Sequence, residues 1–382
     1  MAAGLAWAAS ACGGSAAAPH AAAGPSAAPA TSALAVSPAR LARLRELVSQ
    51  AQSVPPFVPP GPPVNAALAK GDRVVVFPSS SEISYCADEA NDLVALGKTL
   101  GISVTNFTTT GQPTQWVQGA LQAIATHANA FAMTCGIPPS ALTPQLNLAQ
   151  QDHVATILDQ LYDPSLPVPK DVTAATGIPL YQAERLIVDD AIVQNGGRPF
   201  HALILTADDL ISGPGAAKAA EQELKAQCGQ ACPYTVLNVP VADWTTRMQS
   251  DVSAALTADP KITAIIALFD GMVPDTVPAA EAAHRPGLHI YTYGAGAGVV
   301  KLIETTHGLV AANIGASSEW AAYVLMDELL RVLTHSAPAP ATRDYPPLRM
   351  WTPSNVSQYF APNGGYGTQY ITGFDRLWGV HP

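Results

Sequence analysis

The sequence of 382 residues has few basic side chains, with 19 Lys and Arg against 29 Asp and Glu. The basic residues are scattered, and the formal net charge is −10. A surface that binds nucleic acid needs clustered positive charge to displace the counterions of the phosphates. We therefore expect no nucleic-acid partner.

Motifs of common enzyme classes are missing as well. The sequence has no HExxH motif, no G-x-S-x-G nucleophile motif and no apolar run long enough to span a bilayer. Gly294-Ala-Gly-Ala-Gly298 follows a predicted strand, but it lacks the spacing and early position of a dinucleotide-binding turn. Asp189 and Asp190 are neighbours on a predicted helix, so their side chains point apart and form no acid–base pair. We expect no catalysis, no cofactor and no metal.

Charged side chains are also missing from the amino-terminal region, where the first is Arg40. Residues 1–12 end in Ala9-Ser-Ala-Cys12, which resembles the lipobox of a bacterial lipoprotein, although Leu three residues before the cysteine and a basic leader are lacking. An Ala-rich tail with an incidental cysteine is the alternative. Residues 13–38 are rich in Ala, Gly, Ser and Pro and predict a tether. We expect an exported protein held at the membrane surface by a lipid on Cys12.

Four further cysteines predict two disulfide bonds. Cys228 and Cys232 are separated by a turn-forming Gly-Gln-Ala segment. Cys86 follows the first predicted strand and Cys135 ends the third, so neighbouring strands would bring their thiols together. Disulfides indicate an oxidising compartment. A metal site is the alternative, but the spacing is not that of zinc ligands.

Short continuous runs of Val, Ile and Leu recur along the chain, each followed by a polar turn and a helical pattern. Continuous apolar runs are typical of parallel strands that helices cover on both faces. The sequence therefore predicts an α/β protein, and its length predicts two lobes. Ligands of such sheets bind beyond the carboxyl ends of the strands. The predicted strands are 73–81, 102–107, 130–134, 154–158, 202–206, 234–239, 262–268, 288–293 and 309–314.

The lobes are predicted to exchange chain segments. Before them, residues 40–50 have the apolar spacing of a leading helix, which completes an amino-terminal region of 13–64. A Pro-rich bend ending at Lys170 marks the first boundary. We predict that lobe 1 comprises residues 65–165 and 316–345 and that lobe 2 comprises residues 166–315 and 346–382. The aromatic-rich tail of lobe 2 is expected to pack back over both lobes.

Several segments resemble the ribose-type periplasmic solute-binding proteins of ABC importers, within residues 70–335. They are Gly136-Ile-Pro-Pro, Asn195-Gly-Gly-Arg with Ala202-Leu-Ile-Leu, 258–270 and Gly308-Leu-Val-Ala-Ala-Asn. The resemblance implies a type I periplasmic-binding-protein fold, in which two Rossmann-like lobes with parallel sheets are joined by hinge crossings. It also implies a monomer that closes over a sugar-like polar ligand and serves an ABC permease. LacI-type repressors share this core but begin with a helix-turn-helix, where this chain has its tether. A receptor subunit for a membrane sensor kinase is the alternative function.

The resemblance places ligand-binding residues at strand ends of both lobes. The structural alternative for the carboxylates is to cap turns and helices, that for the serines is to bind helix amides, and that for the aromatic residues is core or hinge packing. The candidates are Ser79, Ser81, Glu82, Tyr85, Asp159, Tyr162, Asp208, Asp270, Tyr293 and Trp320.

This chain departs from the family pattern at three predicted polar contacts. Phe269 stands before Asp270, where relatives have Asn, and Tyr293 is followed by Gly-Ala-Gly without the usual Asp. Ala216 falls where relatives carry an Arg that holds the ligand. A pocket without these groups need not hold a pentose or a hexose, so the sequence leaves the ligand open.

Overall fold

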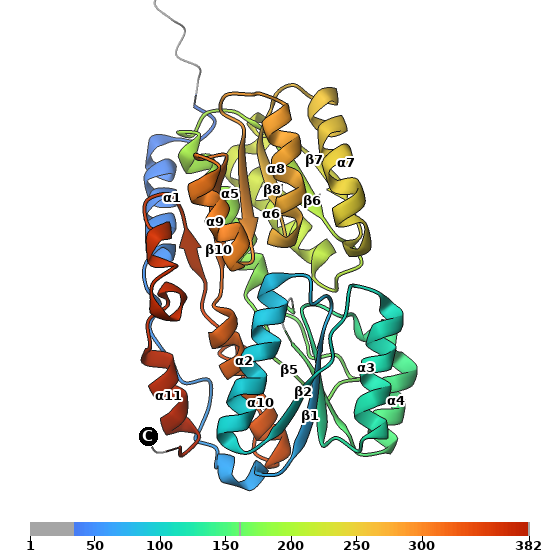
Figure 1. Ribbon diagram of the computed structural model, residues 1–382. Coiled ribbons are helices and arrows are strands. Elements are labelled where there is room, and N and C mark those ends of the chain that lie inside the picture. Colours follow the sequence, from blue (N-terminus) through green and yellow to red (C-terminus); the bar gives the residue numbers. More distant parts are fainter. Residues whose placement is uncertain (1–33, 160–161, 381–382) are drawn as a thin grey trace, which may run out of the picture. The chain divides into compact units, whose positions relative to one another are not determined.

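Strands and helices alternate as predicted in the computed structural model, which describes residues 34–159 and 162–380 (Figure 1). Cys12, the segment 1–12 and the first part of the tether, 13–33, lie outside the described residues. Within the described ranges, no helix is long and apolar enough to cross a membrane. The same ranges contain no group of acidic, His and Cys side chains suited to a metal ion.

The first sheet is parallel and buried on both faces. Its strand order is β2-β1-β3-β4-β5. Along β1, Val74 and Val76 join one apolar cluster, with α2, whereas Val75 and Phe77 join another, with α3 and α4. A continuous apolar run is thus what two helical layers require. The elements are β1 (Arg73–Pro78), α2 (Ser84–Leu100), β2 (Ser103–Asn106), α3 (Pro113–Ala125), β3 (Ala130–Thr134), α4 (Thr143–Gln151), β4 (Ala155–Leu158) and β5 (Ala174–Ala175).

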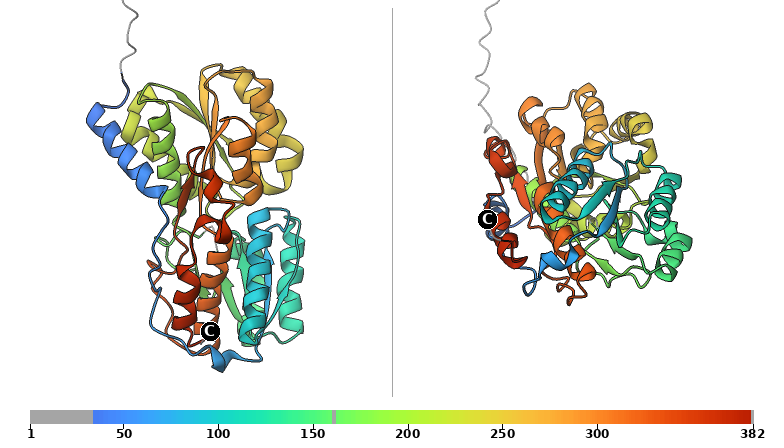
Figure 2. Two further views of the ribbon diagram at one scale, coloured as in Figure 1. Left: turned by 60° about the vertical axis from the view of Figure 1, so that its left-hand side comes forward. Right: turned by 60° about the horizontal axis from the view of Figure 1, so that its bottom comes forward.

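The second sheet has the order β11-β10-β9-β8-β6-β7 and is parallel except for its edge strand β11. Helices cover both of its faces (Figure 2). Its elements are α5 (Leu180–Gln194), β6 (His201–Thr206), α6 (Gly213–Cys228), β7 (Tyr234–Asn238), α7 (Trp244–Ala258), β8 (Ile262–Ala267), α8 (Val273–Ala282), β9 (His289–Tyr293), α9 (Ala297–Thr305), β10 (Val310–Gly315) and β11 (Arg349–Trp351).

Helix α8 contains two prolines. Pro274 occupies its first turn, where a missing N–H costs nothing, and Pro278 lies inside the helix.

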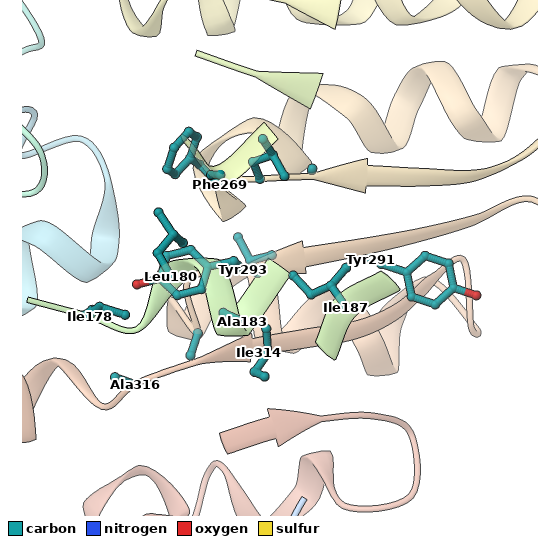
Figure 3. Close-up of a cluster of buried hydrophobic side chains, with 14 of the residues drawn as sticks. Ile178, Leu180, Ala183, Ile187, Phe269, Tyr291, Tyr293, Ile314 and Ala316 are labelled. Atoms are coloured by element: carbon teal, nitrogen blue, oxygen red, sulfur yellow. The ribbon is translucent and has the colours of Figure 1, made fainter. Parts of the chain in front are cut away.

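The chain passes between the two sheets at three places: between β5 and α5, between β10 and α10 (Ser318–Leu333), and between α10 and β11. Near the first two passages, Ile178 and Leu180 lie close to Tyr293 and Ala316 in one apolar cluster (Figure 3). Tyr293 is therefore fixed at the end of β9 by the segments that connect the lobes.

The two outer segments of the described chain pack against each other. Helix α1 (Pro38–Ala51) lies on α5, and the Pro-rich segment after it runs along α10 and α11 (Gln369–Leu377). The ring of Phe57 contacts Phe374 and Trp320, with centroids 5.2 and 6.2 Å away. Val64 N donates to Leu377 O at 2.8 Å. The tail thus reaches both lobes: β11 extends the second sheet, whereas α11 contacts α10 beside the first (Figures 1 and 2).

Both predicted disulfides are confirmed. Cys86, in the first turn of α2, is bonded to Cys135, which directly follows β3, with a Cα–Cα distance of 6.0 Å. Cys228 is bonded to Cys232 at the end of α6, with a Cα–Cα distance of 5.5 Å. The first bond joins segments 49 residues apart, whereas the second closes a local turn of 4.

Candidate functional site

Side chains from the carboxyl ends of both sheets line a cavity of about 40 Å³. A neighbouring groove of about 430 Å³ shares Ile83, Trp244, Asp270 and Gly271 with it. The lining residues of the cavity are Ser79, Ile83, Tyr85, Cys86 and Cys135 from the first lobe, and Leu210, Trp244, Phe269, Asp270, Gly271, Tyr293 and Gly294 from the second. This is the edge at which parallel sheets bind ligands.

Ser79 supplies a hydroxyl from the first lobe. It directly follows β1, and its backbone is fixed, because its N–H donates to Thr134 O at 3.0 Å and its carbonyl accepts from Trp116 Nε1 at 2.9 Å. The side chain is buried, and its Oγ has no hydrogen-bond partner among the described residues. Since an unpaired buried hydroxyl is costly, Ser79 Oγ is a suitable contact for a ligand.

Asp270 supplies the charge from the second lobe. It lies just after β8 and is 5% exposed, and its Oδ2 accepts a hydrogen bond from Gly296 N at 2.7 Å. A side chain at Gly294 would collide with this carboxyl group, and a Cβ at Gly296 would lie 2.9 Å from Oδ2. The glycine-rich turn after β9 therefore makes room for Asp270. Burial raises the pKa of Asp270 to about 6, opposed by the Gly296 N–H, so the carboxylate is ionised at pH 7.

Four aromatic rings form much of the cavity wall. Trp244 and Phe269 stack with their centroids 6.4 Å apart, and Trp244 Nε1 donates to Val239 O at 2.9 Å. Tyr85 and Tyr293 complete the wall from the first and second lobes. Burial raises the pKa of the Tyr293 hydroxyl well above its usual value, and the nearby Asp270 adds to the shift, so this hydroxyl stays protonated.

Sequence reasoning missed several residues of this wall. Trp244 carried a weak signal, because it opens α7, the helix that follows β7 after a short turn over Val241–Asp243. Phe269 was recognised in the sequence only as a departure from the Asn of relatives, and its role in the cavity wall was not predicted. Leu210 and Ile83 carried no signal, because single apolar residues in loops are common. The Cys86–Cys135 disulfide was predicted as a crosslink, and the structure places it in the cavity wall as well.

The structure brings together five of the ten predicted ligand-binding residues. Ser79, Tyr85, Asp270 and Tyr293 line the cavity, and Glu82 lines the neighbouring groove. These five keep their predicted role as candidates.

The other five lie outside the lining of both the cavity and the groove. Ser81 Oγ accepts from Thr109 N at 3.1 Å and so holds two loops together, rather than binding a helix amide. Trp320 stacks on Tyr370 at 4.4 Å between centroids and belongs to the packing of α10 against α11. For these two residues, local pairing explains the side chain without a ligand.

The three remaining candidates also have structural contacts. Asp159, at the end of β4, accepts a hydrogen bond from the Thr176 hydroxyl. The Tyr162 hydroxyl donates to Pro167 O within the Pro-rich bend. Asp208 is exposed, and its backbone N–H donates to Asn238 Oδ1 at 2.9 Å. Their positions at strand ends were predicted, but they bind loops of their own lobes.

Residues 74–336 match the model of the periplasmic binding protein domain family. The chain belongs to this family. Membership confirms the predicted resemblance and indicates an extracytoplasmic binding protein rather than an enzyme. A search of curated proteins finds no match.

Solved structures of similar proteins confirm the fold class. A sugar ABC transporter protein from Yersinia enterocolitica subsp. enterocolitica 8081 has 14% identity and a TM-score of 0.67, over 85% of this chain and 99% of its own. A periplasmic solute-binding protein from Actinobacillus succinogenes 130z with bound D-allose has 15% identity and a TM-score of 0.63, over 75% and 100%. A myo-inositol-binding protein from Caulobacter has 15% identity and a TM-score of 0.63, over 75% and 95%.

Proposed function

We propose that this periplasmic binding protein captures a small polar solute of sugar or polyol size between its lobes and delivers it to the permease of an ABC importer. The observation that supports this most directly is the pairing of Ser79 and Asp270, which come from different sheets and line one cavity. The Actinobacillus protein holds D-allose and the Caulobacter protein binds myo-inositol, which places small hydroxylated solutes in this fold.

Binding requires the lobes to move. The cavity of about 40 Å³ has room for only a few waters, since one water needs about 10–15 Å³ of cavity volume. Pockets for small molecules are usually about 300–1,000 Å³ in volume. A solute therefore enters while the lobes are apart. Once it contacts Ser79 on one lobe and Asp270 on the other, it favours the closed arrangement, because those contacts are complete only there.

A thermal-shift screen of the purified chain tests the capture of a solute. D-Allose, allitol, D-arabinose and myo-inositol form the first panel, because similar proteins hold them. A solute at 100 times its Kd stabilises the protein by about 2.7 kcal/mol. Replacing Ser79 by Ala removes one hydrogen bond and should weaken binding by about three- to tenfold.

The control is Ser81→Ala, which removes a neighbouring hydroxyl outside the cavity lining. Its solute affinity should match that of the unmodified protein, even if its melting temperature falls. Equal losses of affinity in both serine variants would contradict the assignment of Ser79 to the site. The absence of a shift with every solute, neutral or cationic, would contradict the capture of a small polar solute.

We also propose that the chain is anchored by a lipid on Cys12. The Ala9-Ser-Ala-Cys12 sequence supports this. The other four cysteines form disulfide bonds, so they are not available for lipidation. Metabolic labelling with an alkyne fatty acid should mark the native chain, whereas Cys12→Ser should be unlabelled and should leave the membrane fraction. A label that persists in the Cys12→Ser variant would contradict the anchor.

A further inference from the structure

The cavity is poor in hydrogen-bonding groups for a site that holds a polyol. Apart from the two tyrosine hydroxyls, its polar side chains are Ser79 and Asp270, and no Lys, Arg, His, Asn or Gln is among its lining residues. Each hydroxyl of a buried sugar needs its own donors and acceptors, and every unmatched one weakens binding. A neutral hexose would thus leave several hydroxyls unpaired here.

Asp270 lies in this wall and forms no ion pair with a basic side chain of the described residues. No ion pair of the described residues includes Asp270, and its hydrogen bonds come from uncharged donors, the N–H groups of Gly296 and Gly271 and the side-chain amide of Asn313. The neighbouring groove adds the carboxylate of Glu82 and no basic side chain. A buried carboxylate is stabilised by an opposite charge, and here a ligand would have to supply that charge.

The aromatic rings provide, beside the Asp270 carboxylate, a second group that attracts a cation. Trp244 and Phe269 stack nearly parallel, at 21°, and lie directly beside Asp270 in the wall. Because the N–H of Trp244 is used by Val239, the indole contributes its ring to the cavity. The faces of Trp, Tyr and Phe attract cations, and several rings around one site recognise ammonium groups.

We propose that the solute carries a cationic nitrogen, either a protonated amine or a methylated ammonium group, which binds against Asp270 within the rings of Tyr85, Trp244, Phe269 and Tyr293. This inference rests on the proposed capture of a small solute and names its charge. An amino sugar would also place its hydroxyls toward Ser79 and the groove. A methylated amine would contact only Asp270 and the rings.

Isothermal titration of the chain with matched pairs tests the charge. The first pair is glucosamine and glucose, and the second is choline and 3,3-dimethyl-1-butanol, its neutral isostere. We expect the cation of at least one pair to bind about tenfold or more tightly than its neutral partner. Preference within the first pair identifies an amino sugar, and preference within the second identifies a methylated amine.

Variants locate the charge on the protein. Asp270→Asn keeps the shape and should abolish the preference for the cation, whereas Asp208→Asn removes an exposed carboxylate outside the cavity and should leave it unchanged. If Asp270→Asn fails to fold, Phe269→Leu provides the second test. This variant keeps an apolar wall but removes the ring. It should weaken binding of the cation about three- to tenfold and leave binding of the neutral partner unchanged.

The outcomes separate the two proposals. If neutral sugars or polyols bind as tightly as their cationic partners, the proposed positive charge of the solute is refuted, whereas the proposed capture of a solute stands. If neither cations nor neutral solutes bind, both proposals fail. A preference for cations that survives in Asp270→Asn also refutes the site described here.

Discussion

Removal of the two disulfides should have unequal effects on stability. In the chain-entropy model, a crosslink stabilises the native state by restricting the unfolded chain, and more so for a longer loop. The Cys86–Cys135 bond spans 49 residues and the Cys228–Cys232 bond spans 4. These lengths correspond to about 4 and about 2 kcal/mol at 25 °C. The double variant Cys86→Ala/Cys135→Ala should therefore lose about twice the free energy of unfolding lost by Cys228→Ala/Cys232→Ala.

The same pair of variants should differ in solute binding. Cys86 and Cys135 line the cavity and pack with Tyr85 and Ala321, whereas the second disulfide is not part of the cavity lining. Loss of the first bond frees the start of α2 from the end of β3 and should reduce affinity for the solute. Loss of the second should leave affinity unchanged.

Urea unfolding followed by tryptophan fluorescence measures the stability difference, and titration with the best solute from the screen measures the affinity. All three proteins are compared in the same buffer without reductant. Equal losses of stability, or a larger loss from the four-residue loop, would refute the loop-length argument. An unchanged affinity in Cys86→Ala/Cys135→Ala would refute a role for that disulfide in shaping the wall.

Three substitutions test other parts of the structure. Gly294→Ala should lower solute affinity about tenfold or more, because its Cβ collides with the Asp270 carboxyl group at a φ of 149°; titration measures this, with Gly308→Ala, which has open space, as the control. Arg331→Met should cost about 3–5 kcal/mol in urea unfolding, because it removes the guanidinium that lies 2.8 Å from the buried Asp327 carboxylate; a loss below 1 kcal/mol would contradict this. Trp320→Ala should cost about 3–5 kcal/mol but leave solute affinity unchanged; a selective loss of affinity would return Trp320 to the site.

The strands were predictable because a strand that is buried on both faces appears in the sequence as a short continuous apolar run. Val74 to Phe77 form a continuous apolar run, and alternate residues of that run serve opposite clusters. The disulfides were predictable because strand adjacency and a short turn fix which thiols can meet. Strand β11 was missed, because Arg349–Trp351 becomes a strand only by pairing antiparallel with β10, which the local pattern does not encode.

The site was predictable only in part, for the same reason. Ser79 and Asp270 follow strands and Tyr293 ends one, and these positions are visible in the sequence. Trp320 also follows a strand, but its stacking partner Tyr370 is 50 residues further along, so nothing local separates a hinge aromatic from a ligand contact. Trp244 begins the helix after β7, but that position alone does not show that its ring lines the cavity.

The carboxyl-terminal tail has a consequence for how the protein works. Its strand β11 belongs to one lobe and its helix α11 lies against the other, so separation of the lobes must lengthen the link between them, residues 352–368. That link is wound into short turns, with left-handed backbone at Asn363, Gly364 and Gly365. Unwinding these turns releases chain length without breaking either attachment. The length of this link is therefore one of the limits on how far the two lobes can separate, together with the three passages between the sheets.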